Sequence, residues 1–188
     1  TSSGKMGYAV ARAALEAGAE VTLVTGPTCL TPPRDARTLR VTSAQDMLSK
    51  VEEAADHHDI FISVAAVADY YVLNRSEQKI KKDAHILTLE LAPNPDILAN
   101  ISSRPKPPFC VGFAAESENV EEYAELKRRR KHLPLIVAND VTEAVGADEV
   151  QLVLLDEAGK HVLEKADKHI QARRLIAHIA QLYNTRYQ

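Results

Sequence analysis

The sequence predicts an α/β protein built on a doubly wound, mostly parallel β-sheet with helices on both faces and a C-terminal β-hairpin. Strand-like and helix-like stretches alternate through most of the chain, which is the pattern of a parallel sheet with crossover helices. One strand-like run is apolar almost throughout, as a strand covered on both faces should be. With 188 residues, no internal repeat and no dividing linker, we expect one domain over 1–188 with a Rossmann-like sheet.

The first half of the chain predicts two helices and three strands. A helix is expected over 7–20, where small and apolar residues recur at helical spacing and a glycine lies near the end. Ser43 is a candidate N-cap for an amphipathic helix over 43–59. The β-rich and apolar runs predict strands over 21–27, 37–44 and 60–69.

The middle of the chain changes character. Residues 70–85 are polar, so we expect a loop there, and the alternation over 86–92 predicts a strand. Asn94 is a candidate N-cap for a short helix over 94–101, with Pro95 at its first position.

The last third returns to alternating elements. The pattern predicts buried strands over 108–116 and 133–140, with a charged helix over 117–132 between them. A hairpin that turns at 157–159 is expected over 149–166, followed by a closing helix over 168–183.

Composition excludes several classes of protein. A net charge of −3 gives no general surface for nucleic acid or membrane, so any basic function must be local. Cys29 and Cys110 have no CxxC spacing, and the seven histidines form no zinc pattern that we can read. There is no signal peptide and no run of membrane-spanning length, so we expect a cytoplasmic protein with reduced thiols. The chain starts without Met or a preceding strand, which suggests a fragment or an unordered start.

A candidate anion site precedes the first helix, in "SSGKMG". Ser2, Ser3 and Gly4 offer small side chains and backbone amides at a positive helix end, and Lys5 adds charge. An ordinary N-cap with a surface lysine explains the pattern at least as well. The spacing matches neither a Walker loop nor the dinucleotide GxGxxG fingerprint.

Small residues also close two of the expected strands, where α/β sheets expose their ligands. Ala65 and Ala66 would let a ligand approach the backbone, and Asp69 could accept from a ribose or base or help to hold Mg²⁺. A turn aspartate after a small-residue strand end is an equally good reading. Phe113 could stack on a base.

Lysines form the remaining signal. In "KIKK", Lys79 and Lys81 share one side of an extended chain and Lys82 lies on the other. In "KRRRK", Lys127 and Lys131 are four residues apart and share a helix face, although cations at a helix C-terminus are also common for dipole reasons. With no Ser-His-Asp order and no carboxylate pair, the combined signals favour chemistry on a polyanion held by lysines and helix ends.

Six motifs in order, "SSGKMG", "AAVADY", "KIKK", "NPDI", "VGFAAES" and "IVANDV", give the chain a resemblance to the phosphopantothenoylcysteine synthetase family. The chain resembles the bacterial form, usually the C-terminal half of a bifunctional flavoprotein of coenzyme A biosynthesis, from Thr1 to Tyr187. The resemblance implies that CTP and Mg²⁺ activate 4'-phosphopantothenate as an acyl-cytidylate, from which L-cysteine displaces CMP. FMN would belong only to a flavoprotein half outside this chain.

The resemblance also implies roles for individual residues. Lys79 would act in nucleotidyl transfer from a flap. A CTP-binding set is implied at Asp69, Lys79, Asn94, Pro95, Asp96, Ile97, Phe113, Lys127 and Lys131. Ala65 and Ala66 resemble the backbone that lines the phosphopantothenate and intermediate site. The candidate anion site of Ser2, Ser3, Gly4 and Lys5 is expected to bind phosphate or substrate beside it, while the residues that hold the metal stay unknown.

The chain departs from the family pattern in two places. An N-terminal strand, a glycine-rich loop and an asparagine expected before "SSGKMG" are not in it, and the loop at "VGADEV" is shorter than in the family. The family implies a homodimer with composite sites, possibly a higher oligomer through the fused flavoprotein domain. Two other functions stay open: a nicotinamide-dependent oxidoreductase, disfavoured because "VTLVTGP" ends without an acidic residue, and a non-catalytic nucleotide-binding module.

Overall fold

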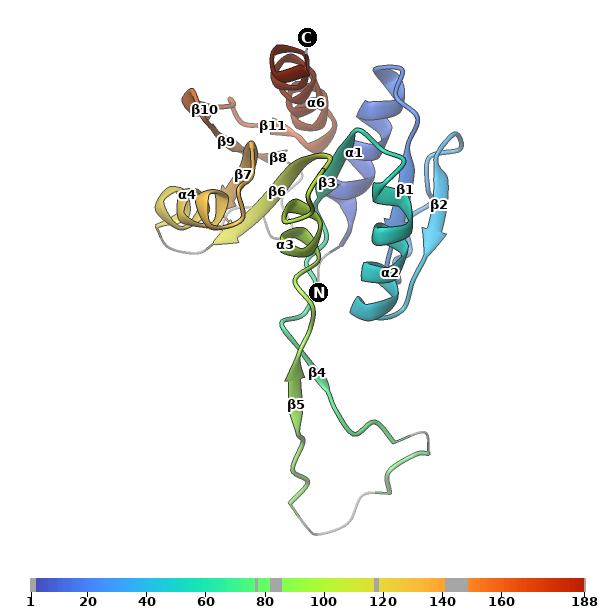
Figure 1. Cartoon of the computed structure of the whole chain (residues 1–188). Helices are drawn as coiled ribbons and strands as arrows, with labels where there is room; N and C mark the ends of the chain where they lie inside the picture. The colour runs from blue at the N-terminus through green and yellow to red at the C-terminus, as the bar shows by residue number, and fades with distance from the viewer. Residues whose placement is uncertain (1–2, 77, 82–85, 117–118, 141–148, 188) are drawn as a thin grey trace.

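The computed structural model describes residues 3–76, 78–81, 86–116, 119–140 and 149–187. Its main sheet has five strands in the order β10-β9-β7-β6-β3 (Figure 1). The parallel strands are β3 (Ile60–Ser63), β6 (Phe109–Glu116) and β7 (Leu135–Asp140). The antiparallel hairpin of β9 (Val153–Asp156) and β10 (Gly159–Val162) extends the sheet beyond β7 and confirms the expected turn at 157–159.

Two further parallel strands form a separate pair. β1 (Thr22–Thr25) is hydrogen-bonded to β2 (Arg37–Arg40), and neither strand is paired with the described strands of the main sheet. A short antiparallel pair of β8 (Glu149–Val150) and β11 (Ala166–Asp167) closes the segment around the hairpin.

Helices cover both faces of the main sheet, as the sequence predicts. On one face, α1 (Lys5–Glu16) packs against α6 (Lys168–Tyr187). On the other lie α2 (Ala44–Ala55), α3 (Ile97–Ser102) and α4 (Val120–Arg130). Alternate residues of β6 feed the two cores because successive strand side chains point to opposite faces: Phe109 and Val111 join the α1–α6 cluster, and Cys110 and Ala114 join the α2–α3–α4 cluster.

The helix ends follow local sequence chemistry. Ser43 caps α2 through a reciprocal capping box, in which its hydroxyl accepts from the Asp46 amide at 3.0 Å and Asp46 Oδ2 accepts from the Ser43 amide at 3.1 Å. Gly18, with φ of 87°, follows the end of α1, and the Ala19 amide donates to the Ala14 carbonyl at 3.0 Å. The left-handed residue allows the chain to turn out of the helix and satisfy one of its last carbonyls.

A long arm leaves the body between β3 and α3, and it differs from the expected loop and strand. Two short antiparallel strands, β4 (Tyr70–Val72) and β5 (Leu91–Pro93), form its base. The sequence analysis missed β4, and its strand over 86–92 is wrong for 86–90, which are described without strand structure. Figure 1 shows this arm, coloured green, extending well away from the sheet and helices. Glu90 still accepts hydrogen bonds across the arm from the Leu73 amide at 2.9 Å and from Asn74 Nδ2 at 3.2 Å, but the regular pairing ends at Leu91.

The predicted strand over 60–69 is also too long. β3 stops at Ser63, and residues 64–68 are irregular. The end of this irregular segment is held by Asn94, which donates to the carbonyls of Ala68 and Asp69 next to the β4–β5 pair. Ala65, Ala66 and Ala68 are exposed, so the apolar run indicates neither the end of the strand pairing nor the burial of its last residues.

Both cysteines are free. Cys29 is exposed, whereas burial of Cys110 raises the pKa of its thiol to about 11, with a small opposing effect of Arg104. Among the described residues, no helix has the length and apolar character needed to cross a membrane.

Gly112 sets how closely α3 and the start of β7 approach β6. A Cβ at this position would lie 2.8 Å from Leu98 Cδ2 and 2.9 Å from Leu133 Cδ1. Both leucines are buried in the α2–α3–α4 core, so neither has room to move away freely.

Gly112→Ala should therefore lower the free energy of unfolding by about 1–3 kcal/mol, the usual cost of overpacking a core. Urea unfolding measures this change. Gly26→Ala is the matched control, since nothing lies within 4 Å of a Cβ there and its φ is not left-handed. Equal stability of the Gly112 and Gly26 variants would contradict the close-approach argument.

Candidate functional site

The parallel strands β3, β6 and β7 have their carboxyl ends on the same side of the sheet, and the first turn of α1 lies beside the carboxyl end of β3. A Cβ on Gly7 would be 3.7 Å from Val64 Cβ, which places the start of α1 against the segment that follows β3. Gly4 is the N-cap of α1 with φ of 74°, a left-handed conformation that favours glycine. The structure thus brings Ser3, Gly4 and Lys5 to the segment that carries Ala65 and Ala66.

These residues form an open, small-residue surface. Ser3, Ala65 and Ala66 are exposed, and the Ser3 hydroxyl accepts from the Lys5 amide at 3.4 Å. Ser2 lies outside the described residues. The unobstructed backbone at a helix N-terminus suits an anion, as the sequence predicts.

On the opposite face of the sheet, an ion pair joins α3 to α4. Lys131, the C-cap of α4, has a side chain only 8% exposed, and its Nζ lies 2.6 Å from Asp96 Oδ2. Asp96 in turn caps α3, because its Oδ1 accepts from the Ala99 amide at 3.0 Å. The expected cap at Asn94 is wrong: α3 starts at Ile97, and the cap with the bonded carboxylate is Asp96.

The charges around Asp96 favour its ionised form. Burial is the largest single influence and opposes ionisation of this carboxyl. The hydrogen bonds from Lys131 and the Ala99 amide, with the charges of Lys131 and Lys127, outweigh burial and hold the pKa of Asp96 below its usual value. Both ammonium groups of the last turn of α4 therefore act at the N-terminus of α3.

Lys127 lies one turn earlier on the same helix face. Its Nζ donates to the Phe113 carbonyl at 3.1 Å, near the end of β6. The Phe113 side chain points the other way and packs against the α1–α6 core. A ligand that contacts both the Phe113 ring and the two lysines must therefore pass over the carboxyl end of β6.

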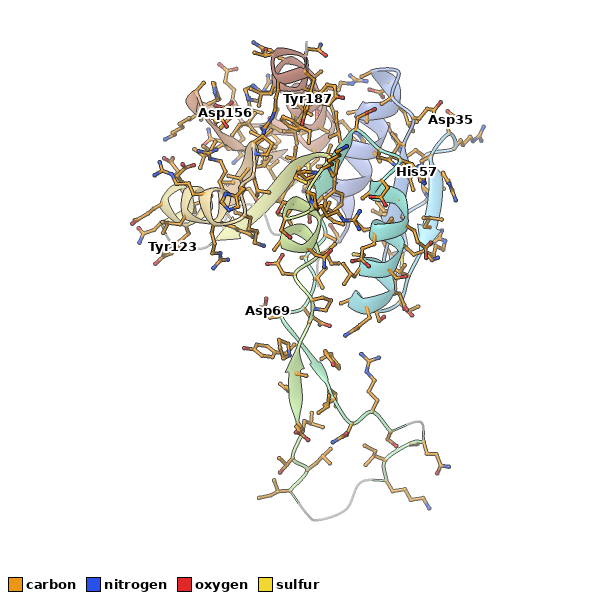
Figure 2. The ribbon with its side chains drawn as sticks, in the orientation of Figure 1. Asp35, His57, Asp69, Tyr123, Asp156 and Tyr187 are labelled. Carbon is orange, nitrogen blue, oxygen red and sulfur yellow. The ribbon has the colours of Figure 1, made fainter. Side chains whose placement is uncertain are left out.

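Asn94 fastens the base of the arm. Its backbone amide donates to the Asp69 carbonyl at 2.8 Å, and its Nδ2 donates to the Ala68 carbonyl at 2.9 Å. Its Oδ1 accepts from Gln45 Nε2 at 3.4 Å, a long contact to α2. Asn94 thus positions the segment after β3, while the Asp69 side chain is exposed at the point where the arm leaves the body (Figure 2).

Lys79 is not part of this cluster within one chain. It is exposed on the distal arm, as is Lys81, and Lys82 lies outside the described residues. Figure 1 shows this part of the arm far from the ends of β6 and β7. The structure thus gathers the predicted residues in three places: around α1 and Ala65, around Asp96 and α4, and on the arm.

One cluster was missed by the sequence analysis. Asp156, His161 and His178 bring their ligand atoms within 4.8 Å of one another at the other end of the sheet. Asp156 ends β9, His161 is in β10 and His178 is in α6, so no short motif joins them. Only the hairpin register, with Asp156 opposite Gly159 and Leu154 opposite His161, hints that the first two share a face.

Glu125 forms ion pairs with Arg128 and Arg129 in the last turn of α4, and we call these three residues the Glu125 clasp. Glu125 accepts from Arg128 at 2.7 and 2.9 Å, and from Arg129 at 2.7 Å. Arg128 also donates to the Leu133 carbonyl at 3.2 Å, which ties the helix end to the start of β7. The hydrogen bonds from Arg128 hold the pKa of Glu125 at about 2, against a smaller opposing effect of burial.

Comparison with known proteins gives one family match. Residues 1–183 match the family described as the DNA/pantothenate metabolism flavoprotein C-terminal domain. Similar proteins include the coenzyme A biosynthesis bifunctional protein CoaBC of Vibrio vulnificus, 51% identical over 144 residues, which are 75% of this chain and 36% of the relative. The Escherichia coli K12 protein of the same name is 42% identical over 190 residues, 97% of this chain and 47% of the relative. The chain thus spans less than half the length of these relatives.

A solved structure gives the same picture. The crystal structure of the C-terminal domain of a CoaBC protein superposes with a TM-score of 0.82 at 37% identity. The match covers 98% of this chain and 85% of that structure. It confirms the α/β fold class with its mostly parallel sheet.

The Glu125 clasp predicts a pH-dependent stability. The folded-state pKa is depressed, so the stabilisation from ionised Glu125 is fully present above the unfolded value near 4.5 and is lost as pH falls towards 2. Glu125→Gln should lower the free energy of unfolding by about 1 kcal/mol at neutral pH, with the difference from wild type shrinking below pH 4.5. Urea unfolding between pH 2 and pH 7 measures it, with Glu122→Gln, exposed on the same helix, as control. A difference that stays constant over this range would contradict the clasp.

Proposed function

Since the chain belongs to the DNA/pantothenate metabolism flavoprotein C-terminal domain family, we propose that it is a ligase that joins 4'-phosphopantothenate to L-cysteine in coenzyme A biosynthesis. CTP would activate the carboxylate, and the products would be 4'-phosphopantothenoyl-L-cysteine, CMP and pyrophosphate. The names of the relatives and the six ordered motifs support this assignment.

The chemistry needs charge stabilisation more than it needs a catalytic base. A carboxylate oxygen of the substrate forms a bond to the α-phosphorus of CTP, and the bond to the bridging oxygen breaks to release pyrophosphate. The cysteine amine then forms the C–N bond, loses a proton and displaces CMP. The first step concentrates negative charge on phosphate oxygens, where fixed cations are most useful.

The observation that carries the proposal is the convergence of Lys127 and Lys131 on Asp96, the N-cap of α3. The ion pair with Asp96 fixes the buried Lys131 side chain, and the bond to the Phe113 carbonyl fixes Lys127. Both ammonium groups are thereby positioned before a triphosphate arrives, which lowers the cost of ordering them on binding. Asp96, Lys127 and Lys131 would form the nucleotide side of the site, with Ile97 beside them at the start of α3.

The surface at the start of α1 would take the acyl substrate. Gly4, Lys5, Ala65 and Ala66 present small side chains and backbone next to one cation, as an extended phosphorylated substrate requires. The activated carboxylate would then lie between this surface and the lysines of α4, over the end of β6. Phe113 and Pro95 would line the nucleotide pocket, because the resemblance to the family includes both in the CTP-binding set.

Magnesium is implied by the family and fits the residues present. A nucleotide-bound Mg²⁺ takes most of its ligands from phosphates and water and needs only one or two carboxylates. Asp69 offers an exposed carboxylate at the base of the arm, and Asn94 holds its backbone in place. When bound, the ion would neutralise charge on the triphosphate.

The arm supports a homodimer with composite sites. Its exposed apolar side chains include Ile80, Ile86, Leu87, Leu89 and Leu91, and Ile86 is 95% exposed. A two-stranded ribbon of this kind has little stability alone, so it needs a surface to bury against. A second copy of the chain would supply that surface and would bring Lys79 of one chain to the cations of its partner.

Two further parts of the proposal concern the chain as a whole. In a doubly wound sheet, the strand that precedes the first helix lies between the positions that β1 and β3 occupy here. In the described chain, β1 and β3 belong to separate sheets and are not hydrogen-bonded to each other. The separation of β1 from β3 supports the family expectation of an additional N-terminal strand.

A fused flavoprotein half would hold FMN, as the bifunctional relatives suggest.

The test of the proposed function is pyrophosphate release by the native chain under single-turnover conditions. With Mg²⁺, CTP and 4'-phosphopantothenate, one equivalent should be released without cysteine, because the acyl-cytidylate forms first. Cysteine should then make the release catalytic, and ATP should support it much less than CTP. No release would remove the ligase assignment in favour of a non-catalytic nucleotide-binding module, and equal rates with ATP and CTP would remove the nucleotide choice.

The composite site predicts complementation between two inactive variants. Lys79→Gln and Lys127→Gln should each slow acyl-cytidylate formation by on the order of 10²–10³, as expected for loss of one positioned charge. Lys127 is preferable to Lys131 as the second position because Lys131→Gln would also break the ion pair between a buried lysine and the carboxylate that caps α3.

Co-expression of the two variants should restore about a quarter of wild-type activity, because half of the C₂ dimers are mixed and each has one intact site. If the arm served its own chain, every site would keep one lesion and no activity would return. Single-turnover pyrophosphate release on the co-expressed sample distinguishes the two outcomes.

A further inference from the structure

Two histidines and an aspartate meet where the C-terminal hairpin packs against α6. Asp156 Oδ2 lies 2.9 Å from His178 Nε2 and 3.1 Å from His161 Nε2. The imidazole rings have centroids 4.8 Å apart and are tilted by 58°. All three donor atoms therefore face one small volume.

The carboxylate of Asp156 is held in a fixed orientation. Its side chain is 1% exposed, and its Oδ1 accepts from the amides of Ala158 and Gly159 at 2.8 and 3.1 Å. Oδ1 thus organises the hairpin turn and leaves Oδ2 for the two imidazoles. Hydrogen bonds behind a ligating carboxylate are a regular feature of protein metal sites.

His161 shows that the cluster is not explained by hydrogen bonds alone. His178 Nε2 is within hydrogen-bond geometry of Asp156, but His161 Nε2 is buried and makes no directional hydrogen bond. A buried ring nitrogen aimed at a carboxylate without a bond is costly unless another group uses its lone pair. The side chain of His161 is 40% exposed although its Nε2 is buried, so this ring lies at the surface and can rotate to admit an ion to the donor atoms.

The geometry points to a binding site for Zn²⁺ or a similar transition-metal dication, with His161 Nε2, His178 Nε2 and Asp156 Oδ2 as ligands. Donor atoms of a tetrahedral Zn²⁺ lie about 3.3 Å apart, because Zn–N and Zn–O bonds are about 2.0–2.1 Å. The two Asp–His separations are close to this value, and small side-chain rotations bring the third into range. Two imidazoles and one carboxylate select such ions over Mg²⁺, which prefers oxygen ligands.

This site is separate from the candidate nucleotide site. Asp156 and Leu154 point to the α6 face of the sheet, where His178 contacts Asp156, whereas the Lys131–Asp96 pair lies on the face covered by α3 and α4. A bound ion would link the edge strand β10 through β9 to α6, and so hold the exposed edge of the main sheet in place. The site carries two donors from one hairpin and one from a helix, so it exists only in the folded chain.

Titration of the metal-free native chain, without a histidine tag, with Co²⁺ tests the proposal through the visible absorption of the ion. Wild type should bind one more Co²⁺ per chain than His161→Ala, and Zn²⁺ but not millimolar Mg²⁺ should displace it. His57→Ala, an exposed histidine outside the cluster, should bind like wild type. His178→Gln should lose the same ion, which provides a second variant if His161→Ala were unstable.

Thermal unfolding gives an independent reading. Zn²⁺ should raise the Tm of wild type and His57→Ala but not that of His161→Ala, because only preferential binding to the folded state raises the midpoint. Equal Co²⁺ binding by wild type and His161→Ala, or displacement by Mg²⁺, would overturn the site. Neither result depends on whether the chain uses CTP.

Discussion

The ion pair between Lys131 and Asp96 is the interaction on which the rest of the candidate site depends. It joins the end of α4 to the cap of α3, and Gly112 lets α3 and the segment before β7 approach β6 closely. An ammonium group with so little exposure requires a partner charge, and a carboxylate that also caps a helix is unable to move away. The cations of α4 are therefore part of the packed structure before any ligand binds.

The arm has the opposite character. Its base is fastened by Asn94, but its distal part presents apolar side chains and lysines to solvent in the described chain. A segment with few buried contacts of its own is free to take its conformation from another surface. Under the proposed function, fixed cations in the body would act together with a cation on the arm while negative charge moves during the chemical steps.

The two ends of the sheet carry different chemistry. At the carboxyl ends of the parallel strands, backbone, small residues and lysines suit phosphate groups. At the opposite end, the antiparallel hairpin places imidazole and carboxylate ligands against α6. The hairpin makes this possible, because an antiparallel strand returns to the end of the sheet where the parallel strands begin.

The sequence by itself determined the alternation of elements, the Ser43 cap, the hairpin turn and the ordered motifs that place the chain in its family. These features depend on local spacing, on turn chemistry or on the identity of short segments. The position of Asp96 as cap, the long arm with β4 and the meeting of Asp156, His161 and His178 were decided by tertiary structure. Each depends on partners distant in the chain: Lys131 for Asp96, β5 for β4, and α6 for the hairpin. Local periodicity carries no information about such partners, because the free energy that selects them comes from contacts formed only when the whole chain packs.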